Sequence, residues 1–197
     1  MNKIIMFFKE NKKSLYFIFT IALVGLAAGI CFYFFISYSD KTKCIDFINK
    51  YLNYIKNKKY FTLFLRSLIF NLIILVLIFI CAFSITGFFT STLVFFAKNF
   101  VTGLYITLIM KTTNYYTASI AYFLPSGFIY LLLFSIMLLF SLSISTNLIF
   151  SLFKGKTINF KNVSKKYLFV FLIIFGISFI FSLYEGFVLP KILLNFI

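Results

Sequence analysis

Histidine and tryptophan are absent from this chain of 197 residues, and acidic residues number only four. The absence of histidine excludes the zinc sites, haem ligation and catalytic triads that depend on a histidine side chain. The three cysteines, Cys31, Cys44 and Cys81, are scattered without CxxC spacing, which indicates neither a metal site nor a disulfide framework. We therefore expect no cofactor and no bound metal.

The shortage of acids also argues against catalysis. Asp40 and Asp46 could be imagined as a glycosidase pair, but lysines flank both of them in a short loop with no substrate-sized domain around it. No nucleotide-binding motif and no GxSxG elbow is present. We therefore expect a protein that is not an enzyme.

Apolar residues dominate what remains. Hydrophobic residues make up 62% of the chain, charged residues 12%, and the mean hydropathy is +1.05, which excludes a water-soluble domain. The apolar runs are continuous and do not alternate, so they favour helices over a barrel. The expected fold class is all-α: a polytopic integral membrane protein with about five transmembrane helices and an amphipathic interfacial helix.

The chain 1–197 is interpreted as a single membrane domain. The expected spans, each about long enough to cross a hydrocarbon core of roughly 30 Å, are 15–38, 68–88, 89–110, 118–142 and 167–189. The second and third spans form a tight hairpin that turns near Gly87, and Pro125 lies in the first turn of the fourth span or breaks a re-entrant entry. An odd number of spans places the two termini on opposite sides.

The loop 39–66 is long and basic, and it carries apolar residues at helical spacing. These residues are Ile45, Ile48, Leu52 and Ile55. The pattern predicts an amphipathic helix that lies at the membrane interface. Its side of the membrane stays open, because its own basic residues compete with two other lysine clusters.

The formal net charge of +15 would suggest nucleic acid in a soluble protein. In a membrane protein it is better explained by topology and by contact with anionic lipid, so we expect membrane lipid and no nucleic acid as a partner. Lysines before the first span, together with the cluster at 154–166, favour an N-terminus inside and a C-terminus outside.

Two ionisable residues, Lys98 and Glu185, fall at or near the interior of spans. Glu185 lies five residues before Pro190 in an almost wholly apolar segment. Ionisable side chains in a membrane face protein or water, pair with one another, and often mark function. An ion pair between the third and fifth spans, contact with a partner, and a path for protons or ions are all compatible with this pattern.

Small residues mark possible contacts between helices. Gly25 and Gly29 form a GxxxG motif in the first span, which permits close approach of two backbones. The partner could be another span of this chain or a second copy, so a homo-oligomer is possible. Gly103 and Gly176 are expected to serve similar packing roles.

Three segments resemble the stage II sporulation protein M family, and the match covers nearly the whole chain. The ending from Ser182 through Glu185 to Pro190 resembles its closing motif, Lys98 with Gly103 resembles its Lys-Gly-x-x-x-Gly segment, and Leu124-Pro125-x-Gly127 resembles its Leu-Pro start to the fourth span. The candidate partner or packing residues are Glu185, Pro190, Lys98, Gly103, Pro125, Gly127, Gly25 and Gly29. Asn99 departs from the family's usual glycine, and Tyr130 stands where many relatives have an acid.

The resemblance implies a multi-pass protein in the cell membrane of endospore-forming bacteria, at the sporulation septum and in the engulfing mother-cell membrane. It implies a scaffold that recruits or positions the sporulation proteins D and P, peptidoglycan hydrolases that thin the septal wall for forespore engulfment. The alternative is a permease-like subunit that moves an ion or a small solute, with Glu185 and Lys98 lining a wet cavity.

Overall fold

A computed structural model describes residues 11–57, 59–113, 127–154 and 160–194, and in these ranges every regular element is helical. The elements are α2 (Lys12–Phe35), α3 (Tyr38–Lys56), α4 (Tyr60–Cys81), α5 (Gly87–Thr113), α7 (Phe128–Lys154), α8 (Phe160–Leu183), the π-helical segment η2 (Tyr184–Val188) and α9 (Leu189–Leu194). Within these ranges, five helices are long and apolar enough to cross a membrane. The prediction of an all-α polytopic membrane protein is confirmed.

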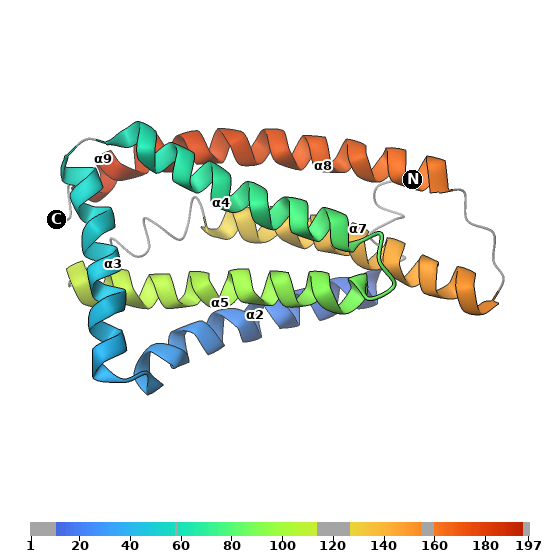
Figure 1. The fold of residues 1–197 in the computed structure, drawn as a ribbon, viewed down its shortest axis with the longest axis horizontal. Coiled ribbons are helices and arrows are strands. Elements are labelled where there is room, and N and C mark those ends of the chain that lie inside the picture. The colour runs from blue at the N-terminus through green and yellow to red at the C-terminus, as the bar shows by residue number, and fades with distance from the viewer. Residues whose placement is uncertain (1–10, 58, 114–126, 155–159, 195–197) are drawn as a thin grey trace.

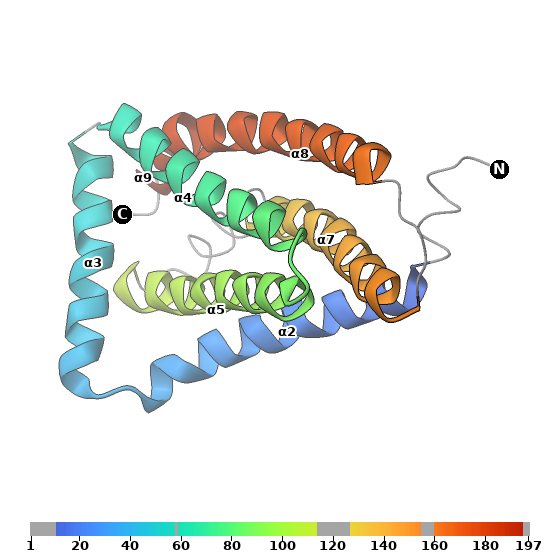
Figure 2. The same ribbon diagram turned by 45° about the vertical axis from the view of Figure 1, so that its right-hand side comes forward.

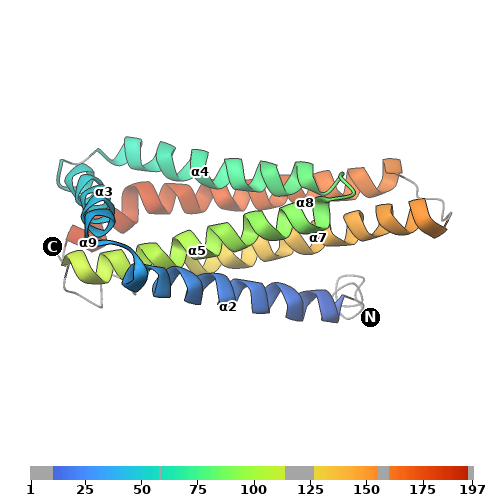
Figure 3. The ribbon, with the colours of Figure 1, turned by 60° about the horizontal axis from the view of Figure 1, so that its bottom comes forward.

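The long helices lie side by side, and α3 runs across one end of them (Figures 1 and 3). We call this end the α3 end; it also holds the start of α4, the end of α5 and α9. The opposite end holds the start of α2, the turn between α4 and α5, the end of α7 and the start of α8. The first and last described helices therefore begin and end at opposite ends of the bundle, as an odd number of spans requires.

The crossing helix α3 has the amphipathic character that its sequence predicts. Ser37 caps its first turn by accepting a hydrogen bond from the Asp40 amide at 3.2 Å, and this contact is of the kind that favours a helix start. Ile48 and Ile55 are fully buried against Leu63 and Leu189, while Lys50 on the other face is exposed. The helix thus covers the bundle end with one apolar face.

Three spans differ clearly from their expected limits, and the fifth, expected at 167–189, is formed by α8, which begins at Phe160, with η2 and α9. The second was expected at 68–88, but α4 already begins at Tyr60 and ends at Cys81, so Arg66 lies within it. The fourth was expected at 118–142; its expected start lies outside the described residues, and α7 runs from Phe128 to Lys154, past the expected end. Continuous hydrophobicity shows that a helix is present but does not show where it starts.

The core is centred on α7. Phe134, Met137, Leu138 and Leu139 are buried among side chains of the neighbouring helices. On α8, the Tyr167 ring stacks on Phe79 of α4 with 4.7 Å between the centroids, and the Tyr167 hydroxyl donates to the Ile78 carbonyl at 3.3 Å. A buried tyrosine needs such an acceptor for its O–H, and this one joins α8 to α4.

The closest contact between backbones joins α2 to α5. A Cβ added at Gly29 would collide with the carbonyl oxygen of Phe100 and lie 2.9 Å from the Leu104 nitrogen. A Cβ added at Gly103 would collide with the Leu26 carbonyl oxygen. Helices in lipid associate through such close packing because lipid chains provide no hydrophobic drive between them.

The glycines predicted to mediate packing fall into two groups. Gly25 also faces α5, since an added Cβ would lie 3.0 Å from that of Asn99. The GxxxG face of α2 therefore packs within the chain in this structure. Gly176 does not pack against another described helix of the chain: nothing lies within 4 Å of its added Cβ, and the residue is on the exposed face of α8. Packing of this glycine against a second copy stays a prediction.

These two environments provide a matched pair of substitutions. Gly29→Leu should separate α2 from α5, because the added side chain cannot be accommodated. The free energy of unfolding should fall by about 1–3 kcal/mol, and the melting temperature of the detergent-solubilised protein should fall with it. Gly176→Leu adds the same atoms on an open face and should leave the melting temperature near that of the wild type. Equal melting temperatures for the two variants would contradict the packing of α2 on α5.

Candidate functional site

Glu185 lies in η2, where α8 passes into α9. Pro190 has no backbone N–H to offer to the Gly186 carbonyl, and the Leu189 N–H donates to the Tyr184 carbonyl in the wider π pattern. A Cβ added at Gly186 would lie 2.7 Å from the Phe64 Cα. This segment therefore lies directly against α4, and π-helical turns of this kind occur frequently at functional sites.

A chain of hydrogen bonds, here called the polar ladder, joins Lys98 to Glu185 through two residues of α4. Lys98 Nζ donates to Asn71 Oδ1 at 3.1 Å, and Asn71 Nδ2 donates to Ser67 Oγ at 3.3 Å. The Ser67 hydroxyl in turn donates to Glu185 Oε2. The ladder thus connects α5, α4 and η2 with donors and acceptors in a consistent order.

A second group of polar contacts connects the Ser67 end of the ladder to Tyr130 of α7. The Tyr130 hydroxyl donates to the Ser178 carbonyl at 3.2 Å and lies 3.0 Å from Ser182 Oγ. Ser182 Oγ is itself 3.4 Å from Ser67 Oγ. Since Tyr130 has used its hydrogen on the carbonyl and Ser67 has used its hydrogen on Glu185, Ser182 can donate to Tyr130 or to Ser67 but not to both. Tyr130 is in either case joined to α8 through the Ser178 carbonyl.

Aromatic rings surround the ammonium group of Lys98. Its Nζ is 4.8 Å from the ring centroid of Phe70, 5.6 Å from that of Tyr130 and 5.8 Å from that of Phe134. Aromatic faces attract a cation, and the effect grows where water is excluded. Within the part of the chain that the structure describes, the Lys98 ammonium therefore has one hydrogen-bond acceptor and is surrounded by aromatic rings.

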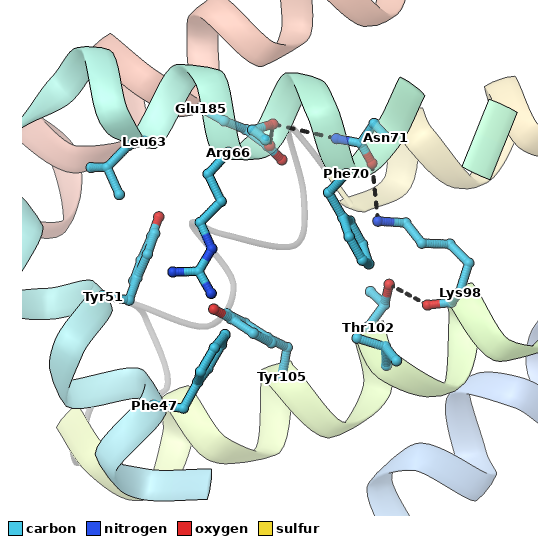
Figure 4. A pocket seen from close by; sticks show the side chains of 12 residues that line it. Phe47, Tyr51, Leu63, Arg66, Phe70, Asn71, Lys98, Thr102, Tyr105 and Glu185 are labelled. Carbon is cyan, nitrogen blue, oxygen red and sulfur yellow. Dashed lines mark hydrogen bonds between the residues drawn. The ribbon is translucent and has the colours of Figure 1, made fainter. Parts of the chain in front are cut away.

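A cavity of about 240 Å³ opens beside the ladder, between α3, α4 and α5 (Figure 4). Its polar lining residues are Arg66, Ser67, Asn71, Lys98, Thr102 and Glu185, with Tyr51 and Tyr105. Its apolar lining residues are Phe47, Leu63, Phe70 and Val101. Two cationic side chains and one carboxylate therefore line the cavity.

The α3 helix completes this cavity at the bundle end. The Arg66 guanidinium lies over the Phe47 ring, 4.6 Å from its centroid, and extends toward the hydroxyl ends of Tyr51 and Tyr105 (Figure 4). Burial raises the pKa of the Tyr51 hydroxyl, and the charge of Glu185 raises it further. Tyr51 therefore keeps its proton and can act as a donor.

The structure brings together the two ionisable residues singled out from the sequence, but their relation differs from a direct ion pair. Among the described residues, Lys98 Nζ contacts Asn71 and not the Glu185 carboxylate. Lys98 lies near the middle of its helix and Glu185 near one end, so the side chains of α4 bridge the difference in depth. The connection therefore involves three helices instead of two.

The remaining candidate residues occupy different places. Gly127 lines a second cavity of about 20 Å³ that also touches Lys98 and Glu185. Pro190 is buried next to η2, and Pro125 lies outside the described residues. Gly25, Gly29 and Gly103 belong to the contact between α2 and α5.

Reasoning from the sequence missed the α4 contribution, namely Ser67, Asn71 and Arg66. Ser67 and Asn71 are four residues apart, which places them on one face of a helix. That spacing was the available signal, but the expected start of the span at 68 divided the pair and left Arg66 in a loop. Tyr130 was noted only as a departure from the family pattern, yet it takes part in the second group of polar contacts.

Comparison with protein families supports the resemblance. The model of the family described as Stage II sporulation protein M matches residues 12–190, which include every element of the site. Comparison with curated proteins and with solved structures gives no match.

The ladder can be tested by a double-mutant cycle on detergent-solubilised protein. Asn71→Leu removes the acceptor of the Lys98 ammonium and should lower the melting temperature strongly, because a buried charge is left without its partner. The double variant Asn71→Leu with Lys98→Met should be less destabilised than the sum of the single changes, with a coupling of about 0.5–3 kcal/mol.

The matched control pairs Asn71→Leu with Lys50→Met, since Lys50 is exposed on α3. This pair should be additive. Additive effects for Asn71 and Lys98 as well would show that the hydrogen bond between them contributes nothing to the fold.

Proposed function

The chain belongs to the stage II sporulation protein M family, and we propose that it is a non-catalytic membrane scaffold of the engulfment machinery. In this role it acts at the sporulation septum and in the engulfing mother-cell membrane. It recruits or positions peptidoglycan-degrading partners, the sporulation proteins D and P, which thin the septal wall. The chemistry belongs to these partners.

One observation carries the proposal: the charged groups of the site are used to join helices of this chain. The polar ladder links α5 and α4 to η2, and Tyr130 of α7 is joined to α8 through the Ser178 carbonyl. A network of this kind holds helices in fixed relative positions. Fixed outer helix faces are what a membrane scaffold must present to its partners.

The outer faces themselves are suited to contact with other helices or with lipid. Along α8, the exposed face carries large apolar side chains, among them Phe169, Leu172 and Ile180. This helix continues through η2, so the orientation of its far end depends on Glu185. We therefore expect a change at Glu185 to reach the partner surface through the end of α8 and α9.

Partner retention tests the scaffold role. The tagged protein is purified in a gentle detergent from cells undergoing asymmetric septation, and co-purified proteins are identified by mass spectrometry. Wild type should retain peptidoglycan hydrolases, and Glu185→Gln should retain several-fold less, because it removes the charge while keeping the shape. Asp46→Asn, the same change at an exposed position of α3, should behave as wild type.

Accumulation and a monodisperse elution profile for Glu185→Gln separate loss of partners from loss of fold. Hydrolases that are absent from the wild-type sample, or that are retained equally by Glu185→Gln, would count against the proposal.

A second candidate, a permease-like subunit, is favoured by one observation. Lys98 and Glu185 line the same cavity of about 240 Å³, and intramembrane ionisable residues often mark paths for protons or ions. This candidate requires the two residues to exchange a proton or an ion with water, whereas the scaffold requires them only to bind each other through α4.

Proton flux distinguishes the two. The purified protein is placed in liposomes that contain a pH-sensitive dye, and a pH step is applied outside. On the scaffold proposal, wild type, Glu185→Gln and protein-free liposomes should acidify at the same rate. A faster wild-type rate that Glu185→Gln abolishes and Asp46→Asn preserves would transfer the proposal to the permease-like role.

A further inference from the structure

Arg66 is the cation of the site that the ladder does not use. Among the residues that the structure describes, its guanidinium has no hydrogen bond or ion pair, and it lies over the Phe47 ring. Figure 4 shows it extended into the cavity, between the hydroxyl ends of Tyr51 and Tyr105 and away from the Glu185 carboxylate. A guanidinium presents five donors in a planar fork, so this position offers a ready site for an acceptor.

The residues that line the cavity carry a net positive charge, which favours the binding of an anion. Arg66 and Lys98 carry positive charge, and Glu185 carries the one negative charge among the lining residues. The carboxylate is engaged by the Ser67 hydroxyl at the far side of the cavity from the guanidinium (Figure 4). One unit of positive charge is therefore left over in a space of low dielectric constant, where a single anion would be strongly attracted.

The rim of the cavity indicates where this anion comes from. Three lining residues are apolar and yet exposed: Phe70 at 45%, Phe47 at 42% and Val101 at 39%. They belong to α4, α3 and α5, and Ile69 and Ile73 continue the exposed apolar surface along α4. The mouth therefore opens toward a surface of the kind that faces acyl chains.

The depth of Arg66 in the membrane agrees with a lipid as the source of the anion. Arg66 is six residues from the start of α4, or about 9 Å along its axis at 1.5 Å per residue. A helix of 22 residues is about 33 Å long, slightly more than the hydrocarbon core. With the small excess shared between the two ends, the Arg66 Cα lies about 7 Å inside the edge of the hydrocarbon core, beneath α3. From this depth a long arginine side chain can reach toward the lipid headgroups, and the exposed Lys56 of α3 lies at the same end.

We propose that the cavity between α3, α4 and α5 binds the phosphate of one anionic phospholipid, with Arg66 as its principal ligand and Tyr51 as a hydroxyl donor. The guanidinium fork matches two phosphate oxygens, and the acyl chains lie along the exposed apolar surface of α4. A lipid so bound fills the space under α3 and neutralises the excess charge. The proposal does not depend on the scaffold role, since the purified protein alone should bind the lipid.

The test is native mass spectrometry of the full-length protein titrated with dioleoylphosphatidylglycerol in detergent. Wild type should take up one such lipid with clear preference over dioleoylphosphatidylcholine, whose choline cation is repelled by Arg66 and Lys98. Arg66→Gln should weaken this first binding event about tenfold, the effect expected from losing a hydrogen bond to a charged group. Lys50→Gln, which removes a charge from the exposed face of α3, should leave it unchanged.

Two further variants keep the test decisive if Arg66→Gln folds poorly. Tyr51→Phe removes only a hydroxyl and should weaken binding severalfold, and Arg66→Lys keeps the charge and should bind better than Arg66→Gln. Equal affinity for the two lipids, or equal losses in Arg66→Gln and Lys50→Gln, would overturn the site. Displacement of the lipid by millimolar inorganic phosphate in an Arg66-dependent way would show a soluble anion as the ligand and overturn the lipid assignment.

Discussion

A carboxylate within a membrane helix is stable only if partners close to it replace the water it has lost, and Glu185 places this requirement on the whole bundle. The polar ladder supplies them from other helices: Ser67 of α4 bonds the carboxylate directly, and Asn71 of α4 and Lys98 of α5 follow in the chain of hydrogen bonds. Each link is a hydrogen bond that works only over a short range. Three helices must therefore keep their relative positions for the charges to be compensated.

Close backbone contacts make that arrangement possible. At Gly186, the absence of a side chain lets η2 lie against Phe64, which brings Glu185 within reach of Ser67. At Gly29 and Gly103, the same property lets α2 support α5, the helix that carries Lys98. Packing and polar bonding thus act together. The small residues set the distances between the helices, and at these distances the hydrogen bonds of the polar ladder can form.

The hairpin of α4 and α5 explains why a cavity accompanies the ladder. The two helices meet at their turn and diverge toward the α3 end in all three views (Figures 1, 2 and 3). Near the turn, Ser145 of α7 donates to the Ala82 carbonyl at 3.1 Å and holds them together. At the other end, α3 spans the gap and leaves Arg66 facing a space that a lipid headgroup would fill. A scaffold with a lipid in this position would have its geometry coupled to the membrane around it.

The sequence by itself determined the class of protein, because continuous apolar runs permit only helices in lipid and because each backbone polar group must then bond within its own helix. It also predicted α3 from the spacing of Ile48 and Ile55, the hairpin turn near Gly87, and Lys98 and Glu185 as residues of interest. These are properties of single helices, which depend on residues near one another in the chain. Only the tertiary structure decided that Ser67 and Asn71 bridge the two charges, that Arg66 faces a cavity, and that Gly29 packs closely while Gly176 is open. Such contacts join residues far apart in sequence, and their distances follow from how the helices pack, which the hydrophobic pattern of any one helix does not specify.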